Sequence, residues 1–171
     1  MKNTKSLRVL IVEDSEDDAL LIIRALKKGG YDPVHERVES AAAMKKALKE
    51  KSWDIILCDY KLPGFDGIKA ITLLKEANID IPFIIVSGAI GEEVAVECMR
   101  LGAHDYIMKG NLSRLCPAIA RELQELEVRN KKVQAESKLH ESEERFRILT
   151  ESSPTAILLY QNNKWVYSNS A

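Results

Sequence analysis

Residues 7–14 have the sequence LRVLIVED, an apolar run that ends on two carboxylates. The run contains β-branched side chains and does not alternate with polar ones, which is typical of a strand buried on both faces of a parallel sheet. Glu16–Lys28 then carries apolar side chains at helical spacing, and Gly29-Gly30 marks where a helix would stop. This first pair predicts a chain in which strands and helices alternate.

Four more strand and helix pairs follow. The expected elements, strand and helix in turn, are 34–38 and 41–51, 54–58 and 67–77, 83–86 and 92–101, and 105–108 with a further helix behind it. Ser40 is expected to cap the helix that begins at residue 41. Five such repeats predict an α/β fold, a doubly wound parallel sheet with right-handed crossovers and helices on both faces. In such sheets the ligand site lies at the carboxyl ends of the strands.

The composition excludes several classes of protein. The 171 residues hold 25 Lys+Arg and 26 Asp+Glu, whereas a nucleic-acid-binding domain needs a clear basic excess. No apolar run approaches the roughly 18 residues of a membrane-spanning helix, so no membrane segment is expected. The N-terminus turns acidic too early for a signal peptide. An odd set of 3 cysteines without metal-ligand spacing predicts a reduced, cytoplasmic protein.

Side chains that can carry chemistry follow four of the five expected strands. Glu13 and Asp14 come after the first strand, Asp59 after the third, Ser87 after the fourth and Lys109 after the fifth. Three carboxylates at one edge repel each other unless a cation lies among them, and such hard oxygen ligands suit Mg²⁺. A lysine and a hydroxyl beside them would bind a phosphoryl group, for which a carboxylate can be the nucleophile. The spacing therefore predicts a Mg²⁺-assisted phosphoryl site on Asp59.

Residues 7–120 resemble the receiver domain of two-component response regulators, the CheY-like family. The matching stretches are LIVED at 10–14, LCDYKLPGFDG at 57–67, IIVSG at 84–88 and GAHDYIMK at 102–109. The resemblance implies a (βα)5 flavodoxin-like receiver domain over residues 1–120. It also implies that Asp59 accepts phosphate from a phosphohistidine on a histidine kinase or phosphotransfer protein, as one step of a phosphorelay.

The same resemblance assigns the metal ligands. Glu13 and Asp14 match the acidic pair that holds Mg²⁺, and Asp59 and the backbone carbonyl of Lys61 match the further ligands. Glu13 stands where the family commonly has Asp, a variant that should still bind the metal.

A switch is implied as well. Ser87 matches the hydroxyl that follows the phosphoryl group, Lys109 the lysine that contacts it, and Tyr106 the aromatic residue whose rotamer reports the switch. Gly110 stands where the family usually has proline, so the usual cis peptide bond after Lys109 is in doubt.

A long charged helix is expected behind the receiver. We expect it to run from Ser113, as N-cap, to Leu149, and residues 121–150 to form a coiled-coil-like linker. Ile119, Leu123, Leu126 and Val133 fit one heptad frame, and Ala135, Leu139, Phe146 and Leu149 fit a second. These frames predict a parallel homodimer, which is weak because the two frames are offset and the seam is imperfect. The alternative is a single helix held by its own ion pairs.

The last part of the chain is expected to form a hairpin over residues 156–167. Residues 141–171 are similar to the opening of a PAS sensor domain, so residues 151–171 are interpreted as its truncated start. The chain is then expected to be a fragment of a longer signalling protein, whose output could be a histidine kinase or another enzyme.

Two other functions fit parts of the pattern. One is a receiver-fold interaction or dimerisation module that phosphate does not regulate, against which the complete set of carboxylates, Ser87 and Lys109 argues. The other is an aspartyl-phosphate hydrolase of the haloacid dehalogenase type, which needs a second Asp two residues after the nucleophile, where Lys61 stands. The preferred interpretation is a receiver that catalyses only its own phosphorylation and dephosphorylation.

Overall fold

The computed structural model describes residues 4–88, 91–161 and 164–169. The chain consists of two units, residues 1–126 and 127–171. Each unit is described by itself below. None of the helices in the described ranges combines the length and the apolar character that crossing a bilayer requires.

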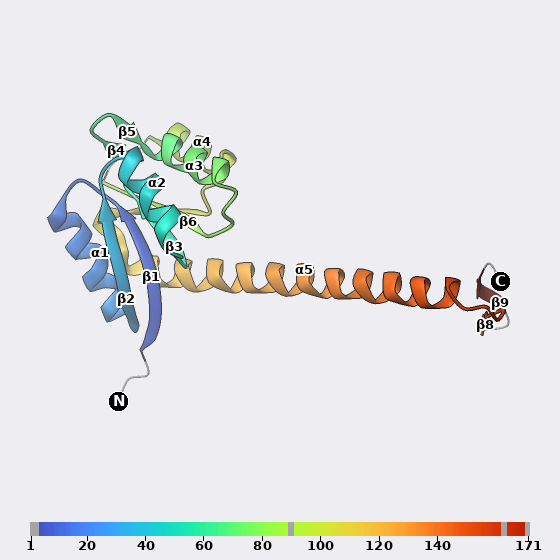
Figure 1. Ribbon diagram of the computed structural model, residues 1–171. Coiled ribbons are helices and arrows are strands. Elements are labelled where there is room, and N and C mark those ends of the chain that lie inside the picture. The colour runs from blue at the N-terminus through green and yellow to red at the C-terminus, as the bar shows by residue number, and fades with distance from the viewer. Residues whose placement is uncertain (1–3, 89–90, 162–163, 170–171) are drawn as a thin grey trace. The chain divides into compact units, whose positions relative to one another are not determined.

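The first unit is built around a parallel sheet of five strands in the order β2-β1-β3-β6-β7 (Figure 1). The strands are β1 (Lys5–Val12), β2 (Tyr31–Val38), β3 (Ile55–Cys58), β6 (Phe83–Ser87) and β7 (Asp105–Met108). Because the chain moves outward from β1 to β2 and then returns to the other side of β1 for β3, the strand order reverses there. This arrangement confirms the predicted flavodoxin-like α/β fold, and its switch point is where a ligand site is expected.

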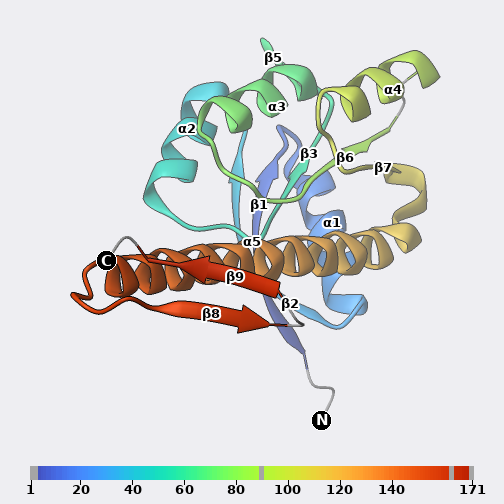
Figure 2. The ribbon, with the colours of Figure 1, turned by 90° about the vertical axis from the view of Figure 1, so that its right-hand side faces the viewer.

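Helices cover both faces of the sheet (Figures 1 and 2). They are α1 (Glu16–Lys28), α2 (Ala41–Glu50), α3 (Gly67–Glu76), α4 (Glu92–Arg100), the 3₁₀ helix η1 (Lys109–Arg114) and α5 (Leu115–Glu151). One apolar core lies between the sheet and α2, α3 and α4, and a second lies between the sheet, α1 and the first turns of α5. The central strands β3 and β6 are buried at every position, which explains their uninterrupted apolar sequences.

Two short strands, β4 (Lys61–Leu62) and β5 (Phe65–Asp66), form a small antiparallel hairpin between β3 and α3. Asp66 ends this hairpin as the N-cap of α3, because its carboxylate accepts a hydrogen bond from the Lys69 N–H at 2.8 Å. Ser40 caps α2 in the same way, as predicted, by accepting from the Ala43 N–H.

The second strand is longer than the sequence suggested. Only 34–38 was expected, whereas β2 runs from Tyr31 to Val38 and includes Pro33. The reason is the position of β2 at the edge of the sheet, where proline is tolerated. The N–H groups of Lys5 and Glu13 donate to carbonyls on the β2 side, so by alternation Leu7, the partner of Pro33, faces β2 as well. The nitrogen of Pro33 therefore faces the free edge and removes no bond of the sheet.

The expected start of the long helix was wrong. α5 begins at Leu115, directly after η1. Within η1, the backbone of Asn111 is not helical. Ser113 lies inside η1, where its hydroxyl donates to the Asn111 side chain at 2.5 Å, and it is therefore not the residue before α5. Pro117 nevertheless lies in the first turn of α5, where its missing N–H costs little.

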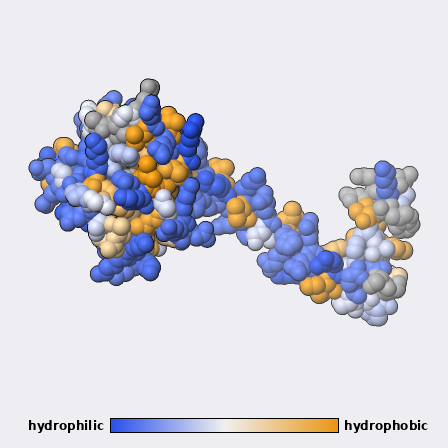
Figure 3. Space-filling view, turned by 90° about the horizontal axis from the view of Figure 1, so that it is seen from above, coloured by the Kyte–Doolittle hydropathy of each residue, from blue (hydrophilic) through white to orange (hydrophobic). Residues whose placement is uncertain are grey.

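The second unit contains the rest of α5 and an antiparallel hairpin, β8 (Leu158–Gln161) and β9 (Lys164–Ser168), which confirms the predicted hairpin. The rings of Phe146 and Tyr167 meet edge to face at 5.5 Å, and the Tyr167 hydroxyl lies 2.6 Å from that of Thr150. The Asn169 amide donates to the Thr150 carbonyl. These contacts fasten the hairpin to the end of the helix. Figure 3 shows that hydrophobic side chains along α5 are separated by hydrophilic ones.

Candidate functional site

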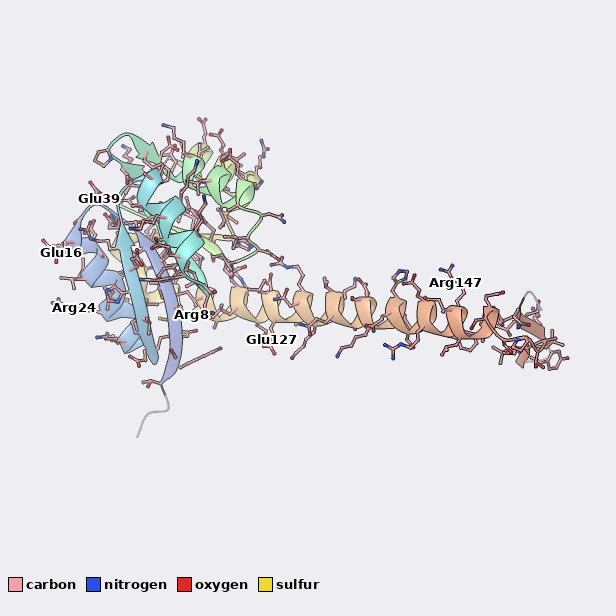
Figure 4. The ribbon with its side chains drawn as sticks, viewed as in Figure 1. Arg8, Glu16, Arg24, Glu39, Glu127 and Arg147 are labelled. Atoms are coloured by element: carbon pink, nitrogen blue, oxygen red, sulfur yellow. The ribbon has the colours of Figure 1, made fainter. Side chains whose placement is uncertain are left out.

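The sheet brings three carboxylates together at its carboxyl edge. Glu13 and Asp14 follow β1, and Asp59 follows β3 directly beside it. Two backbone hydrogen bonds extend the sheet into these loops: the Glu13 N–H donates to the Val38 carbonyl and the Asp59 N–H to the Val12 carbonyl. One oxygen from each of Glu13, Asp14 and Asp59 lies within 4.8 Å of the others. Figure 4 labels Glu16 and Glu39 near the same edge, close to the ends of β1 and β2.

Lys109, the first residue of η1, brings a cation into this group. Its Nζ atom lies 2.7 Å from Glu13 Oε2, 2.7 Å from Asp59 Oδ2 and 2.5 Å from Asp18 Oδ2. The hydrogen bonds go to Asp59 and Asp18, whereas Glu13 is close without a hydrogen-bonding angle. Burial alone would lower the pKa of Lys109, but the three carboxylates outweigh it and the pKa is raised, so the ammonium stays charged.

Glu13 has the least exposed carboxylate of the group. Its side chain is 1% exposed, and Oε1 accepts a hydrogen bond from the Ser15 N–H at 3.1 Å. Oε2 is buried and receives no hydrogen bond from any residue in the described part of the chain. Burial raises the pKa of Glu13 above its ordinary value, although the Lys109 ammonium acts in the opposite direction. The Lys109 ammonium, 2.7 Å away, offsets the charge of Oε2, but this buried oxygen still lacks a hydrogen-bond donor among the described residues and is free to accept a metal ion.

These donors fit a divalent metal ion. They are hard carboxylate oxygens from three residues, one of them buried and without a hydrogen bond, and Asp14 is exposed and leaves room for water ligands. The fourth predicted ligand, Lys61, lies close to the group. Its N–H donates to Asp59 Oδ1 at 3.3 Å, while the metal-binding role of its carbonyl stays a prediction.

Ser87 lies on β6, which pairs with β3, and Tyr106 lies on β7, the edge strand beyond β6. Ser87 is the last residue of β6, is 3% exposed and pairs in register with Met108 of β7. Tyr106 is half-buried against the core under α3 and α4, and its hydroxyl donates to the Met108 sulfur at 2.6 Å. Their positions are compatible with a switch, and their roles stay predictions. Every peptide bond in the described ranges is trans, including the one between Lys109 and Gly110.

Two residues at this edge were missed from the sequence. Asp18 was interpreted only as an acidic neighbour of the first helix, in the run EDSEDD, where nothing marks which carboxylate turns inward. Arg37 was not considered, and its guanidinium donates to the backbone carbonyls of Glu13, at 2.9 Å, and Asp14, at 3.2 Å. Every residue has a main-chain carbonyl, so the sequence does not show which carbonyls a side chain such as Arg37 will bind.

Known proteins match the first unit. The model of the response regulator receiver domain family matches residues 9–120. The chemotaxis protein CheY of Bacillus subtilis is 31% identical over 102 residues, which are 60% of this chain and 84% of CheY. The transcriptional regulatory protein PrrA of Mycobacterium tuberculosis is 31% identical over 104 residues, 61% of this chain and 44% of PrrA. The chain thus covers less than half of that regulator.

Solved structures agree with these matches. The N-terminal domain of a response regulator/sensory box/GGDEF 3-domain protein from Carboxydothermus hydrogenoformans superimposes with a TM-score of 0.61 at 26% identity, covering 71% of this chain and 98% of that domain. Family match, sheet order and the acidic cluster beside Lys109 agree, and the cluster fits a phospho-acceptor site. The chain belongs to the response regulator receiver domain family and carries a receiver of two-component signal transduction.

Proposed function

We propose that Asp59 accepts a phosphoryl group from a phosphohistidine on a histidine kinase or phosphotransfer protein. The observation that carries the proposal is the position of the Asp59 carboxylate, which is hydrogen-bonded to Lys109 and adjoins Glu13 and Asp14. An Asp59 oxygen attacks phosphorus, and the phosphorus–nitrogen bond breaks. Its electron pair leaves on the imidazole, which then takes a proton. Attack by water on phosphorus later restores the carboxylate and releases inorganic phosphate.

We propose Mg²⁺ as the cation, held by the carboxylates of Glu13, Asp14 and Asp59 and by the Lys61 carbonyl. When bound, it supplies positive charge beside the transferring phosphoryl group. Lys109, which is hydrogen-bonded to Asp59 Oδ2, supplies a second positive charge, and the Ser87 hydroxyl is the neutral donor for a phosphoryl oxygen. The low exposure of Asp59, with 11% of its side chain accessible, limits attack by water.

The signal is proposed to leave the site through Ser87 and Tyr106. Ser87 is the last residue of β6 and Tyr106 lies on β7, and helix α4 connects these two strands along the chain. A phosphoryl group can favour only the conformation that contacts it better. Movement of Ser87 toward it would change the space beside Tyr106 and shift the population of conformations at α4 and β7.

Residues 121–150 are proposed as a helical linker that can pair with a second copy, and 151–171 as the start of a PAS-like domain. From Glu127 to Leu149 every residue of α5 is exposed, including Val133 and Leu139. The first frame must be shortened, however, because Ile119 and Leu123 pack into the receiver core. The name of the Carboxydothermus protein puts a sensory box after a response regulator, and this order supports a sensor segment behind the receiver.

Mass spectrometry of the intact chain tests the phosphorylation proposal. With Mg²⁺ and acetyl phosphate, the chain should gain the mass of one phosphoryl group, as acetate leaves with the electron pair of the broken phosphorus–oxygen bond. Asp59→Asn should gain none, while Asp66→Asn, which keeps a capping side chain at α3, should gain the full mass. A full gain by Asp59→Asn would refute the assignment. No gain by the wild-type chain would favour an interaction module that phosphate does not regulate.

A further inference from the structure

Asp18 is the third carboxylate on the Lys109 ammonium. Its Oδ2 atom lies 2.5 Å from Nζ, in a contact that joins the first turn of α1 to the start of η1. The side chain of Asp18 is 34% exposed and that of Lys109 only 17%, so the bond lies at the rim of the site. A charge-assisted hydrogen bond in this position restrains a long, otherwise mobile side chain.

The local structure of α1 leaves Asp18 available for this contact. Ser15 is the N-cap, and its hydroxyl accepts from the Asp18 N–H at 3.2 Å, which fixes the backbone of Asp18. An acidic side chain at this helix position commonly bonds back to the N–H of the capping residue. Here the Ser15 N–H donates to Glu13 Oε1 instead. The Asp18 carboxylate is therefore not needed as a cap and turns toward Lys109.

Asp18 also stands apart from the carboxylates that fit a metal ion. That group consists of Glu13, Asp14 and Asp59 in the described part of the chain. A cation would engage Glu13 and Asp59, and phosphorylation would convert an Asp59 oxygen into the bridging oxygen of an acyl phosphate. Of the three carboxylates on Lys109, Asp18 is the one that neither event occupies.

We infer that Asp18 is a positioning residue, which holds the Lys109 ammonium at the phosphoryl site before, during and after phosphoryl transfer. The inference rests on the proposed phosphorylation of Asp59. An ammonium has three N–H groups, and two of them are directed at Asp18 and Asp59. On phosphorylation the N–H that pointed at Asp59 turns to a phosphoryl oxygen, while the bond to Asp18 keeps Nζ in place.

The rate of phosphorylation tests this role. At saturating Mg²⁺, Asp18→Asn should slow phosphorylation by acetyl phosphate about tenfold or more, because the transition state then has to order Lys109. Asp17→Asn is the matched control, since Asp17 is exposed in the same turn of α1 and loses the same charge. Its rate should stay within about twofold of wild type, as for a surface charge.

A double-mutant cycle separates positioning from plain charge. If Asp18 acts through Lys109, then adding Asp18→Asn to Lys109→Met should cause no further slowing. A plain charge effect would act in the opposite direction, since removing a negative charge favours an anionic donor. Equal slowing by Asp18→Asn with and without Lys109 would overturn the inference.

A spectroscopic readout does not depend on phosphorylation. In ¹⁵N spectra of the lysine ammonium groups, the signal lost in Lys109→Met should be shifted or broadened in Asp18→Asn and unchanged in Asp17→Asn. If the wild-type chain takes up phosphate on Asp59 while Asp18→Asn matches its rate and its spectrum, the inference alone fails. If wild type takes up none, the proposed function fails, and with it the role of Asp18.

Discussion

The three carboxylates at the sheet edge differ in their surroundings, and each therefore contributes differently. Glu13 is buried and rigid, since one of its oxygens is bonded to the Ser15 N–H. Asp14 is exposed and lies open to water. Asp59 is bonded on one oxygen to Lys109 and on the other to the Lys61 N–H. Residue type alone does not disclose that one of these carboxylates is buried, one is exposed and one is hydrogen-bonded to Lys109.

Removal of two of these charges should weaken metal binding. Glu13→Gln combined with Asp14→Asn should raise the Kd for Mg²⁺ about tenfold or more, because each charge within about 4 Å contributes about 1–4 kcal/mol. Titration calorimetry measures the change. Glu16→Gln combined with Asp17→Asn removes the same charge from exposed positions of α1 and should alter the Kd far less. Equal affinities for the two double variants would place the metal elsewhere.

A surface ion pair gives the stability of the first unit a predictable dependence on pH. The Arg8 guanidinium and backbone N–H both bind Asp54; although burial acts in the opposite direction, they lower the pKa of that carboxyl. Because the folded-state pKa is lowered, the contribution is present above the ordinary pKa of Asp and is lost as pH falls through the lowered value. Urea unfolding should show Asp54→Asn less stable than wild type at pH 7 and closer to it at pH 3. A difference independent of pH would contradict this assignment.

The site residues that could be predicted are those whose chemistry is visible in their type and spacing. Glu13, Asp14, Asp59 and Lys109 follow strand ends, and the sheet brings them together. Asp18 and Arg37 could not be found in this way. Only the geometry of the first turn of α1 decides that Asp18, among several neighbouring acidic residues, contacts Lys109. Arg37 donates to main-chain carbonyls, which residue types do not reveal.

Elements were predicted well where one periodic signal dominated. α1 was expected at Glu16–Lys28 and lies there, because its apolar stripe and the following glycines agree. The start of α5 was missed because the 3₁₀ helix η1, which contains the non-helical residue Asn111, precedes it. The first heptad frame was predicted to begin too near the start of α5, because the core of the receiver and a coiled coil both require apolar side chains at helical spacing. Ile119 illustrates this, since it is fully buried in the core.

The switch is expected to act on α4 and β7. Beryllofluoride with Mg²⁺, a stable mimic of the phosphoryl group, should change amide hydrogen exchange in Glu92–Arg100 and Asp105–Met108. Ser87→Ala should reduce that change, because the hydroxyl that contacts the mimic is lost. An effect confined to the loop behind Asp59 in the wild-type chain would show that the signal does not leave through this face.

For the whole molecule, the exposed part of α5 predicts association. Sedimentation should show dimers of the 171-residue chain at high concentration and monomers of a chain that ends at Leu126, the boundary of the first unit. Val133→Glu combined with Leu139→Glu should shift the full chain toward monomer by placing charge on the apolar seam. Identical monomeric masses for all of these chains would leave α5 as a single helix held by its own ion pairs.

The proline at the edge of the sheet has a consequence for the behaviour of the protein at high concentration. An edge strand displays free N–H and C=O groups, on which a strand of another molecule can be added, and such growth leads to aggregation. The backbone nitrogen of Pro33 faces this edge and carries no hydrogen, and the adjacent Asp32 adds an exposed charge. A strand added beside β2 would therefore lack the main-chain hydrogen bond at Pro33. Growth of the sheet at the β2 edge is therefore less favourable than on a strand with a complete row of donors.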